Sequence, residues 1–222
     1  MSDGSKFIAL QEVLPDVSRE TFDRLLAYEA LFFKWSKAFN LAAPSTLNDF
    51  WQRHVIDSVQ LFAIRKPAGT WVDLGSGGGL PGIIMSILMC ESKEGVVHLI
   101  ESNGKKAAFL RNAILETSAS GIVHQIRIED ASKVVPTANV VTARALASLP
   151  ELLALAKPWL DAGSTALFHK GREFREEVKV ARDVYRFDLI EHPSMVDPAS
   201  AILEIRMEAA RTERESRATK DV

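Results

Sequence analysis

The sequence predicts an α/β fold: a mostly parallel sheet with helices on both faces, an antiparallel edge and an N-terminal helical extension. Three observations predict it. From Thr70 to about Met207, short β-rich runs alternate with helical runs, which is typical of a parallel sheet. At Val72–Gly82 a β-rich run passes through glycines into a helical run. The last two β-rich runs have no helix between them.

Composition restricts the class of protein. The chain has 222 residues, 47% of them hydrophobic and 25% charged, which fits one globular domain with a small extension. It carries 27 Lys and Arg against 29 Asp and Glu, a net charge of −2. This balance excludes general binding of polyanions through the overall field, so any nucleic-acid contact must come from a local patch.

The sequence also indicates the compartment. A single cysteine, Cys90, can form no intramolecular disulfide, makes a cysteine-based zinc site very improbable and suits a reducing environment. We expect no metal site. The N-terminus lacks the features of a signal peptide, and the apolar run Leu80–Cys90 is too short to span a bilayer. We expect a soluble cytoplasmic protein with no membrane partner.

Residues 1–66 are expected to form a helical segment packed on the core. Apolar side chains recur at helical spacing over Phe22–Leu41. Thr46 or Asn48 is a candidate cap for a second helix, which runs through Phe62 and is ended by the breaker pair at 67–69. Residues 67–207 are expected to form the α/β domain. Residues 208–222 have almost no large apolar side chains, so we expect a disordered tail there.

Within the α/β domain, the elements follow from the alternation of patterns. Strands are expected at 71–74, 96–101, 122–128, 140–142 and 165–169, with helices at 81–90, 105–117, 149–160 and 173–183. The final runs, 185–191 and 202–207, flank a turn-rich segment and are expected to pair antiparallel at one edge.

The glycine-rich turn matches two cofactor-binding patterns. Gly77, Gly79 and Gly82 satisfy the G-x-G-x-x-G of dinucleotide sites. The stretch Asp73–Gly79 satisfies the D-x-G-x-G-x-G of Rossmann-like methyltransferases that bind S-adenosylmethionine. The second pattern is favoured, because its glycines begin directly after the apolar run Trp71–Leu74. A structural turn without a ligand is the remaining alternative.

Acidic residues follow at the ends of the next two strands. Glu101 lies 22 residues after Gly79, where an acid can accept hydrogen bonds from ribose hydroxyls. Both cofactors contain that ribose, so Glu101 supports a nucleoside site without choosing between them. The run Arg127–Asp130 ends the third predicted strand, where its acids can accept from an adenine amine or simply face solvent.

Several blocks of sequence together resemble a known family. They are 34–37, 40–41, 53–58, 73–82, 104–106, 109–111, 144–145, 147–149 and 170–171. The Arg-His-x-x-Asp-Ser run at 53–58 and the Gly-Leu-Pro-Gly ending of the loop are the specific ones. The chain resembles the glucose-inhibited division protein B family, the small-subunit ribosomal RNA methyltransferases G. Residues 75–79 read Gly-Ser-Gly-Gly-Gly where that family commonly has Gly-Thr-Gly-Pro-Gly, and we expect cofactor binding to survive this difference.

The resemblance implies a Rossmann-like S-adenosylmethionine-dependent methyltransferase fold. It implies transfer of a methyl group to N7 of a guanine in the decoding-region loop of 16S ribosomal RNA, either free or in the small ribosomal subunit. Carried over by position, the family's cofactor contacts fall on Gly75, Leu80, Ile128, Glu129 and Arg144; the general methyltransferase pattern adds Gly77 and Glu101. We also expect a monomer.

Methylation at N7 agrees with the absence of sequence motifs that other base methylations use. Guanine N7 has a free lone pair, so positioning suffices and no general base is required. Residues 142–145 contain no Asn/Asp-Pro-Pro-aromatic motif, which methylation of an exocyclic amine usually uses. Arg144 ends the fourth strand, where it could bond guanine O6, a phosphate or the cofactor carboxylate, or form a structural salt bridge. Lys170 and Arg172 are candidate RNA-phosphate contacts.

Two alternatives differ in function class. A dinucleotide-dependent oxidoreductase would bind NAD, but the chain shows no evident Tyr-x-x-x-Lys pair for hydride transfer. A non-catalytic ribosome-binding factor would keep the fold and lose cofactor affinity. The intact Asp73, Gly75, Gly77 and Glu101 argue against that factor.

Overall fold

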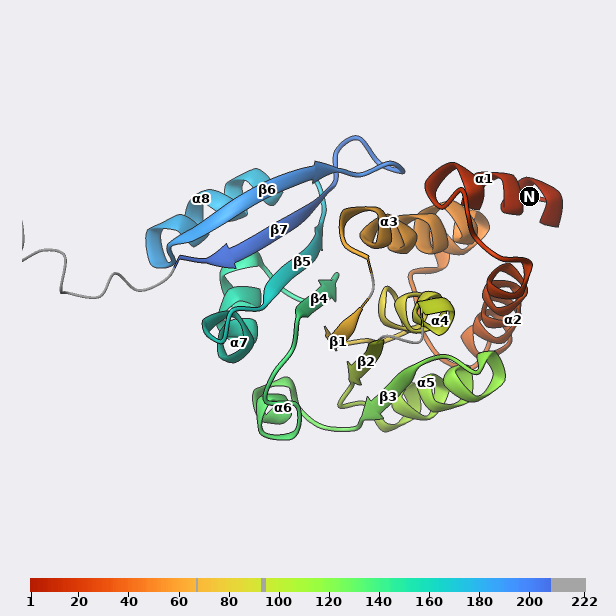
Figure 1. The fold of residues 1–222 in the computed structure, drawn as a ribbon, viewed down its shortest axis with the longest axis horizontal. Helices are drawn as coiled ribbons and strands as arrows, with labels where there is room; N and C mark the ends of the chain where they lie inside the picture. The colour runs from red at the N-terminus through yellow and green to blue at the C-terminus, as the bar shows by residue number, and fades with distance from the viewer. Residues whose placement is uncertain (67, 93–94, 209–222) are drawn as a thin grey trace, which may run out of the picture.

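The computed structural model describes residues 1–66, 68–92 and 95–208. Their strands form one sheet in the order β3-β2-β1-β4-β5-β7-β6 (Figure 1). The strands from β3 to β5 run parallel, whereas β7 runs antiparallel to both β5 and β6. The predicted fold class is therefore confirmed. The strands are β1 (Gly69–Leu74), β2 (Gly95–Ile100), β3 (Gly121–His124), β4 (Val140–Arg144), β5 (Thr165–Lys170), β6 (Phe187–Pro193) and β7 (Ala201–Met207).

Helices cover both faces of the sheet. One face carries α4 (Gly82–Ser92) and α5 (Gly104–Thr117); the other carries α6 (Ile128–Val134), α7 (Leu149–Asp161) and α8 (Phe174–Val184) (Figure 1). Successive strand side chains point to opposite faces. Trp71 accordingly packs in the apolar core beside α4, and the next residue, Val72, packs in the core beside α7. Both faces of the central strands are buried, as a parallel sheet requires.

The N-terminal helices widen the layer formed by α4 and α5. They are α1 (Asp3–Val13), α2 (Arg19–Ser36) and α3 (Asp57–Ile64), and they lie on the same side of the sheet as α4 (Figure 1). The buried Phe22 and Phe32 of α2 join Trp71 and Ile83 in one apolar core. Among the described residues, no helix is both long and apolar enough to cross a membrane. Residue 67 and, apart from Glu208, the predicted tail 208–222 lie outside the described residues.

The N-terminal helices differ from those predicted. The helix expected over Phe22–Leu41 spans Arg19–Ser36, and its start is capped by Ser18, whose Oγ accepts a hydrogen bond from Thr21 N at 3.0 Å. The predicted second helix is three pieces, namely a 3₁₀ helix η1 (Pro44–Asp49), a π-helix η2 (Trp51–Ile56) and α3. The wider π turn buries Trp51 together with Val55 and Ile56, four and five residues later.

The third strand is shorter than predicted. Ile122–Ile128 was expected to be one strand, but β3 ends at His124 and Ile128 begins α6. Glu129 and Asp130 occupy the first turn of α6, where acidic side chains favour a helix N-terminus. This early end brings Ile128 and Glu129 to the carboxyl edge of the parallel strands.

Candidate active site

The loop after β1 depends on its glycines. Gly75, Gly77 and Gly79 have φ values of 63°, 53° and 83°, in the left-handed region that side chains other than glycine avoid. A Cβ added to Gly75 would lie 2.7 Å from Leu146 Cδ1. The backbone therefore turns sharply at the carboxyl end of β1, where ligands bind in folds of this type.

The N-terminal helical segment packs against this loop and fixes its position. Tyr28, which is fully buried in α2, donates its hydroxyl hydrogen bond to the Gly78 carbonyl oxygen. A Cβ on Gly78 would lie 2.8 Å from Phe32 Cε2 and 2.9 Å from the carbonyl oxygen of Leu41. The chain needs glycine here because the helical segment approaches the loop so closely. Residue 78 is also where the loop departs most from the family pattern.

Asp73 supports the loop from inside the sheet. Its Oδ1 accepts a hydrogen bond from Thr142 Oγ1 of β4 at 2.7 Å. Burial raises the pKa of Asp73 to about 6, although the hydrogen bond from Thr142 lowers it. Asp73 is only 1% exposed, so it acts on the loop's position and lies away from the ligand space.

A cavity of about 340 Å³ lies beside the loop, and we call it the glycine-loop cavity. Four of the predicted site residues line it: Gly75, Glu101, Ile128 and Glu129. Glu101 Oε2 accepts from Gly77 N at 2.9 Å, and its Oε1 accepts from Asn103 N at 2.7 Å. These two hydrogen bonds fix the carboxylate at the carboxyl end of β2.

Gly77 and Leu80, also predicted as cofactor contacts, do not line this cavity. The amide of Gly77 orients Glu101, so its effect on a ligand there is indirect. Leu80 is partly buried and packs against the apolar core beneath the loop. Direct cofactor contact by these two residues stays a prediction.

A second cavity, of about 510 Å³, lies on the other side of Ala145 and is called the Arg144 cavity. Ala145 lines both cavities and has a φ of 50°, which is uncommon for a residue with a side chain. Strained backbone of this kind clusters at binding and catalytic sites. The Arg144 cavity is lined by Asp49, Arg53, Asp57, Arg144, Ala145, His169, Lys170, Gly171, Ser194, Val196, Asp197, Ser200 and Ala201.

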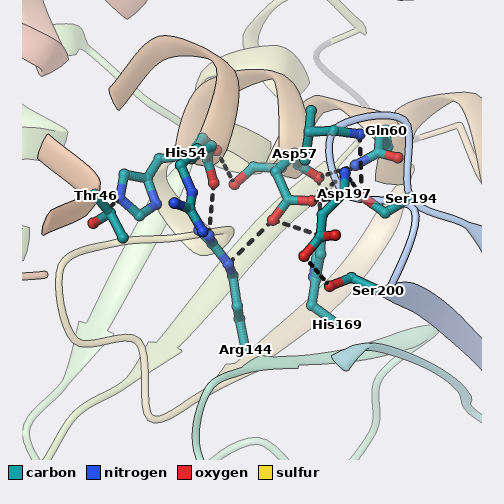
Figure 2. Close-up of polar contacts among 12 residues, drawn as sticks. Thr46, His54, Asp57, Gln60, Arg144, His169, Ser194, Asp197 and Ser200 are labelled. Carbon is teal, nitrogen blue, oxygen red and sulfur yellow. Dashed lines mark hydrogen bonds and ion pairs between the residues drawn. The ribbon is translucent and has the colours of Figure 1, made fainter. Parts of the chain in front are cut away.

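Arg144 is fixed in place by the N-terminal segment. Its Nε lies 3.2 Å from Asp57 Oδ2, and its Nη2 donates to the Arg53 carbonyl oxygen at 2.7 Å (Figure 2). The side chains of Arg144 and Asp57 are only 18% and 11% exposed. Burial lowers the pKa of Arg144, whereas the charge of Asp57 raises it. The two charges therefore compensate each other away from bulk water.

Asp57 connects Arg144 to two further elements. Its Oδ1 accepts from Gln60 Nε2 at 2.9 Å, and its carbonyl oxygen accepts from His169 Nε2 at 2.9 Å (Figure 2). Burial lowers the pKa of His169, which favours the neutral imidazole. Nε2 carries the proton because its partner, a carbonyl oxygen, can only accept. Gln60 Oε1 in turn accepts from Met195 N in the β6–β7 loop at 2.6 Å.

This network is the part of the site that sequence reasoning missed. The Arg-His-x-x-Asp-Ser run contains both Arg53 and Asp57, but nothing in its spacing identifies Arg144 as their partner, 91 residues after Arg53. His54 of the same run turns away from Arg144, and its Nε2 lies 2.8 Å from Thr46 Oγ1 (Figure 2).

The two predicted RNA contacts differ in their surroundings. Lys170 has a side chain that is 8% exposed, and its Nζ lies 2.5 Å from Glu177 Oε2. The same ammonium donates to the Ala147 carbonyl oxygen at 2.8 Å. Arg172, by contrast, is exposed. A phosphate would therefore compete with Glu177 for Lys170. At Arg172 the described residues form no ion pair within 4 Å, although the charge of Arg172 helps to lower the pKa of Asp197.

Comparisons with known proteins agree with this geometry. Residues 21–204 match the family model described as rRNA small subunit methyltransferase G. Relatives with the name ribosomal RNA small subunit methyltransferase G, from Brucella ovis and Brucella suis, are each 53% identical over 205 residues, which is 92% of this chain and 96% of the relative.

Solved structures show the fold at lower sequence identity. A fibrillarin/Nop5p complex matches with a TM-score of 0.55 at 14% identity, covering 71% of this chain and 82% of that one. The P. horikoshii TYW2 structure in complex with MeSAdo matches with a TM-score of 0.52 at 18% identity, covering 71% of this chain and 63% of that one.

Proposed function

The chain belongs to the rRNA small subunit methyltransferase G family, and from that premise we propose that it methylates 16S ribosomal RNA with S-adenosylmethionine. The proposed target atom is N7 of a guanine in the decoding-region loop, guanine 527 in the usual numbering. The proposed substrate is 16S RNA, free or in the small subunit. We further propose that the protein acts as a monomer in the cytoplasm.

The observation that carries this proposal is the glycine-loop cavity at the carboxyl ends of β1, β2 and β4. Its chemistry fits the adenosine part of the cofactor. The Glu101 carboxylate suits two ribose hydroxyls, and Glu129 suits the amine of an adenine packed beside Ile100 and Ile128. Because Gly75 has no Cβ, the Leu146 side chain, which also lines this cavity, can pack directly against the loop.

Few residues are needed for the reaction itself. When bound, S-adenosylmethionine supplies an electrophilic methyl group. Guanine N7 offers its lone pair without losing a proton, so the chain need only align the two partners and exclude water. Arg144, which stands beside the glycine-loop cavity, is the proposed positioning group. Arg144 lines the neighbouring cavity and not this one, so the cofactor contact that the resemblance implies for it is a separate prediction, which the affinity measurement below tests.

The alternative functions have less support. An NAD-dependent oxidoreductase would belong to another family, and the family match covers residues 21–204. A binding factor without cofactor affinity would not need the positive φ of Gly75 and Gly77 or the fixed Glu101.

A methyl-transfer assay tests the proposal. Small subunits that lack the modification are incubated with the protein and S-adenosylmethionine carrying a labelled methyl group, and the product RNA is cleaved chemically at 7-methylguanine. The expected result is one cleavage, in the decoding-region loop. If label is incorporated but the RNA is not cleaved, the N7 assignment is wrong. If neither subunits nor free RNA incorporate label, the methyltransferase proposal is wrong.

A further inference from the structure

Resting on that proposed function, we propose that the Arg144 cavity receives the target guanine after it leaves the RNA stack. Arg144 then donates a hydrogen bond to guanine O6, and Asp57 acts as the positioning residue that holds Arg144. The pocket is a binding site distinct from the glycine-loop cavity.

The size and lining of the Arg144 cavity suit a nucleobase. Its volume of about 510 Å³ lies within the range of roughly 300–1,000 Å³ for small-ligand pockets. Its lining contains carboxylates, such as Asp49 and Asp197, as well as the cations Arg53 and Arg144. Guanine presents both donors and acceptors at its edges, so it can use charges of both signs. A site for phosphate alone would have no use for the carboxylates.

The place of the cavity suits base modification. Enzymes that act on a base inside folded nucleic acid swing it into a pocket. Ala145 lines both cavities, so a base in one would lie beside a cofactor in the other. The positive φ of Ala145, 50°, turns the chain directly after Arg144, at the border of the two cavities.

Arg144 has donor capacity left for a ligand. Nε faces Asp57, and Nη2 donates to the Arg53 carbonyl oxygen. Within the described part of the chain, Nη1 makes no hydrogen bond. The guanidinium is therefore held along one edge and keeps N–H groups for an acceptor in the cavity.

Recognition of O6 also explains the choice of atom. O6 and N7 are neighbouring acceptors on one edge of guanine, whereas adenine has an amine where guanine has O6. A donor on O6 holds N7 close by and leaves its lone pair free. Arg144 at the border of the cavities would thus select guanine over adenine and direct N7 toward the cofactor.

The test replaces the target guanine with 2-aminopurine, which keeps N7 and lacks O6. Small subunits are reconstituted with 16S RNA carrying either base, and kcat/KM for methyl transfer is compared. We expect wild type to prefer guanine about tenfold or more. Arg144→Lys keeps the charge beside Asp57 but lacks the planar fork, so the preference should fall several-fold. Arg206→Lys, on β7, is the matched control and should keep it.

A second variant keeps the test valid if a single substitution of Arg144 destabilises the fold. The double variant Asp57→Ala/Arg144→Ala removes both buried charges together, and its guanine preference should approach one. Affinity for S-adenosylmethionine, measured by calorimetry, should stay within about threefold of wild type in Arg144→Lys. An unchanged guanine preference in both Arg144 variants would overturn the inference. Weaker cofactor binding combined with unchanged preference would make Arg144 a cofactor ligand instead.

The same experiment separates this inference from the function on which it rests. If wild type methylates no guanine substrate, the proposed function fails and the base pocket fails with it. If wild type methylates guanine and 2-aminopurine equally well, the methyltransferase stands and recognition of O6 by Arg144 is wrong.

Discussion

The glycine-loop cavity and the Arg144 cavity are neighbours, but they are built in different ways. The first uses backbone turns and strand ends, with three glycines at positive φ and the carboxylate of Glu101 bonded to Gly77. The second uses side chains from α3, β4, β5 and the β6–β7 loop, joined through Asp57. The glycine loop that borders the first cavity is one continuous segment, so it is visible as a motif. The network around Asp57 joins separate segments, so no motif shows it.

The two cavities should also fail differently when they are mutated. Damage to the glycine loop removes a place for the ligand and leaves the rest of the fold intact. Damage to the Arg144–Asp57 pair leaves a buried charge without compensation, so it should affect stability as well as function. The predictions below test this difference, from the largest expected effect to the smallest.

Arg144→Ala should lower the free energy of unfolding by about 3–5 kcal/mol, because it leaves the Asp57 carboxylate buried and unpaired. Adding Asp57→Ala to it should recover part of that loss, since no unpaired charge then remains. Urea denaturation measures all the variants. Arg206→Ala, at a side chain that is 58% exposed, is the control and should cost less than about 1 kcal/mol. A loss below about 1 kcal/mol for Arg144→Ala would refute the compensated pair.

Gly75→Asp should weaken binding of S-adenosylmethionine by about 100-fold or more. The new side chain meets Leu146 and places a carboxylate beside the proposed cofactor site. Gly163→Asp is the matched control, because Gly163 also has a positive φ, 94°, and its Cβ would meet nothing within 4 Å. Calorimetry gives both affinities. Equal weakening in the two variants would attribute the effect to backbone strain and would remove the site from this loop.

Asp73, which lies beneath the glycine loop, should make the free energy of unfolding depend on pH. Its folded pKa of about 6 lies above that of an unfolded aspartate, about 3.9, so the folded protein binds the proton more tightly. Asp73 therefore adds stability as the pH falls from about 6 to about 4, and this stability is lost as the pH rises again. Relative to Asp73→Asn, wild type should gain about 2–3 kcal/mol between pH 7 and pH 4.

Urea denaturation at the two pH values measures that difference. Asp188→Asn, at an exposed position of β6, controls for the substitution itself. A gap between wild type and Asp73→Asn that stays constant with pH would show that Asp73 does not titrate in this range.

Arg172→Ala should have the smallest effect, a loss of a few-fold in RNA affinity with cofactor affinity unchanged. An exposed arginine that contacts one phosphate contributes about one unit to the slope of log affinity against log salt. Filter binding at several salt concentrations measures that slope. Lys157→Ala, on α7, is the control and should leave the slope unchanged. An unchanged slope in Arg172→Ala as well would remove Arg172 from the RNA surface.

Much of the fold could be read from the sequence because its signals are local. The alternation of β-rich and helical runs gave the parallel sheet and its antiparallel edge, and both are confirmed. The errors occurred where tertiary packing overrides local preference. The π turn at Trp51–Ile56 exists because it buries Trp51, and α6 begins at Ile128, inside what had been expected to be a strand.

By itself, the sequence determined the glycine loop, the acid at Glu101 and the resemblance to a methyltransferase family, because these depend on short segments with fixed chemistry. Only the tertiary structure decided that Arg144 pairs with Asp57, that Lys170 is occupied by Glu177 and that two cavities meet at Ala145. The physical reason is distance along the chain. Charges compensate each other according to their separation in space, and only the folded sheet brings α3 against the ends of β4 and β5.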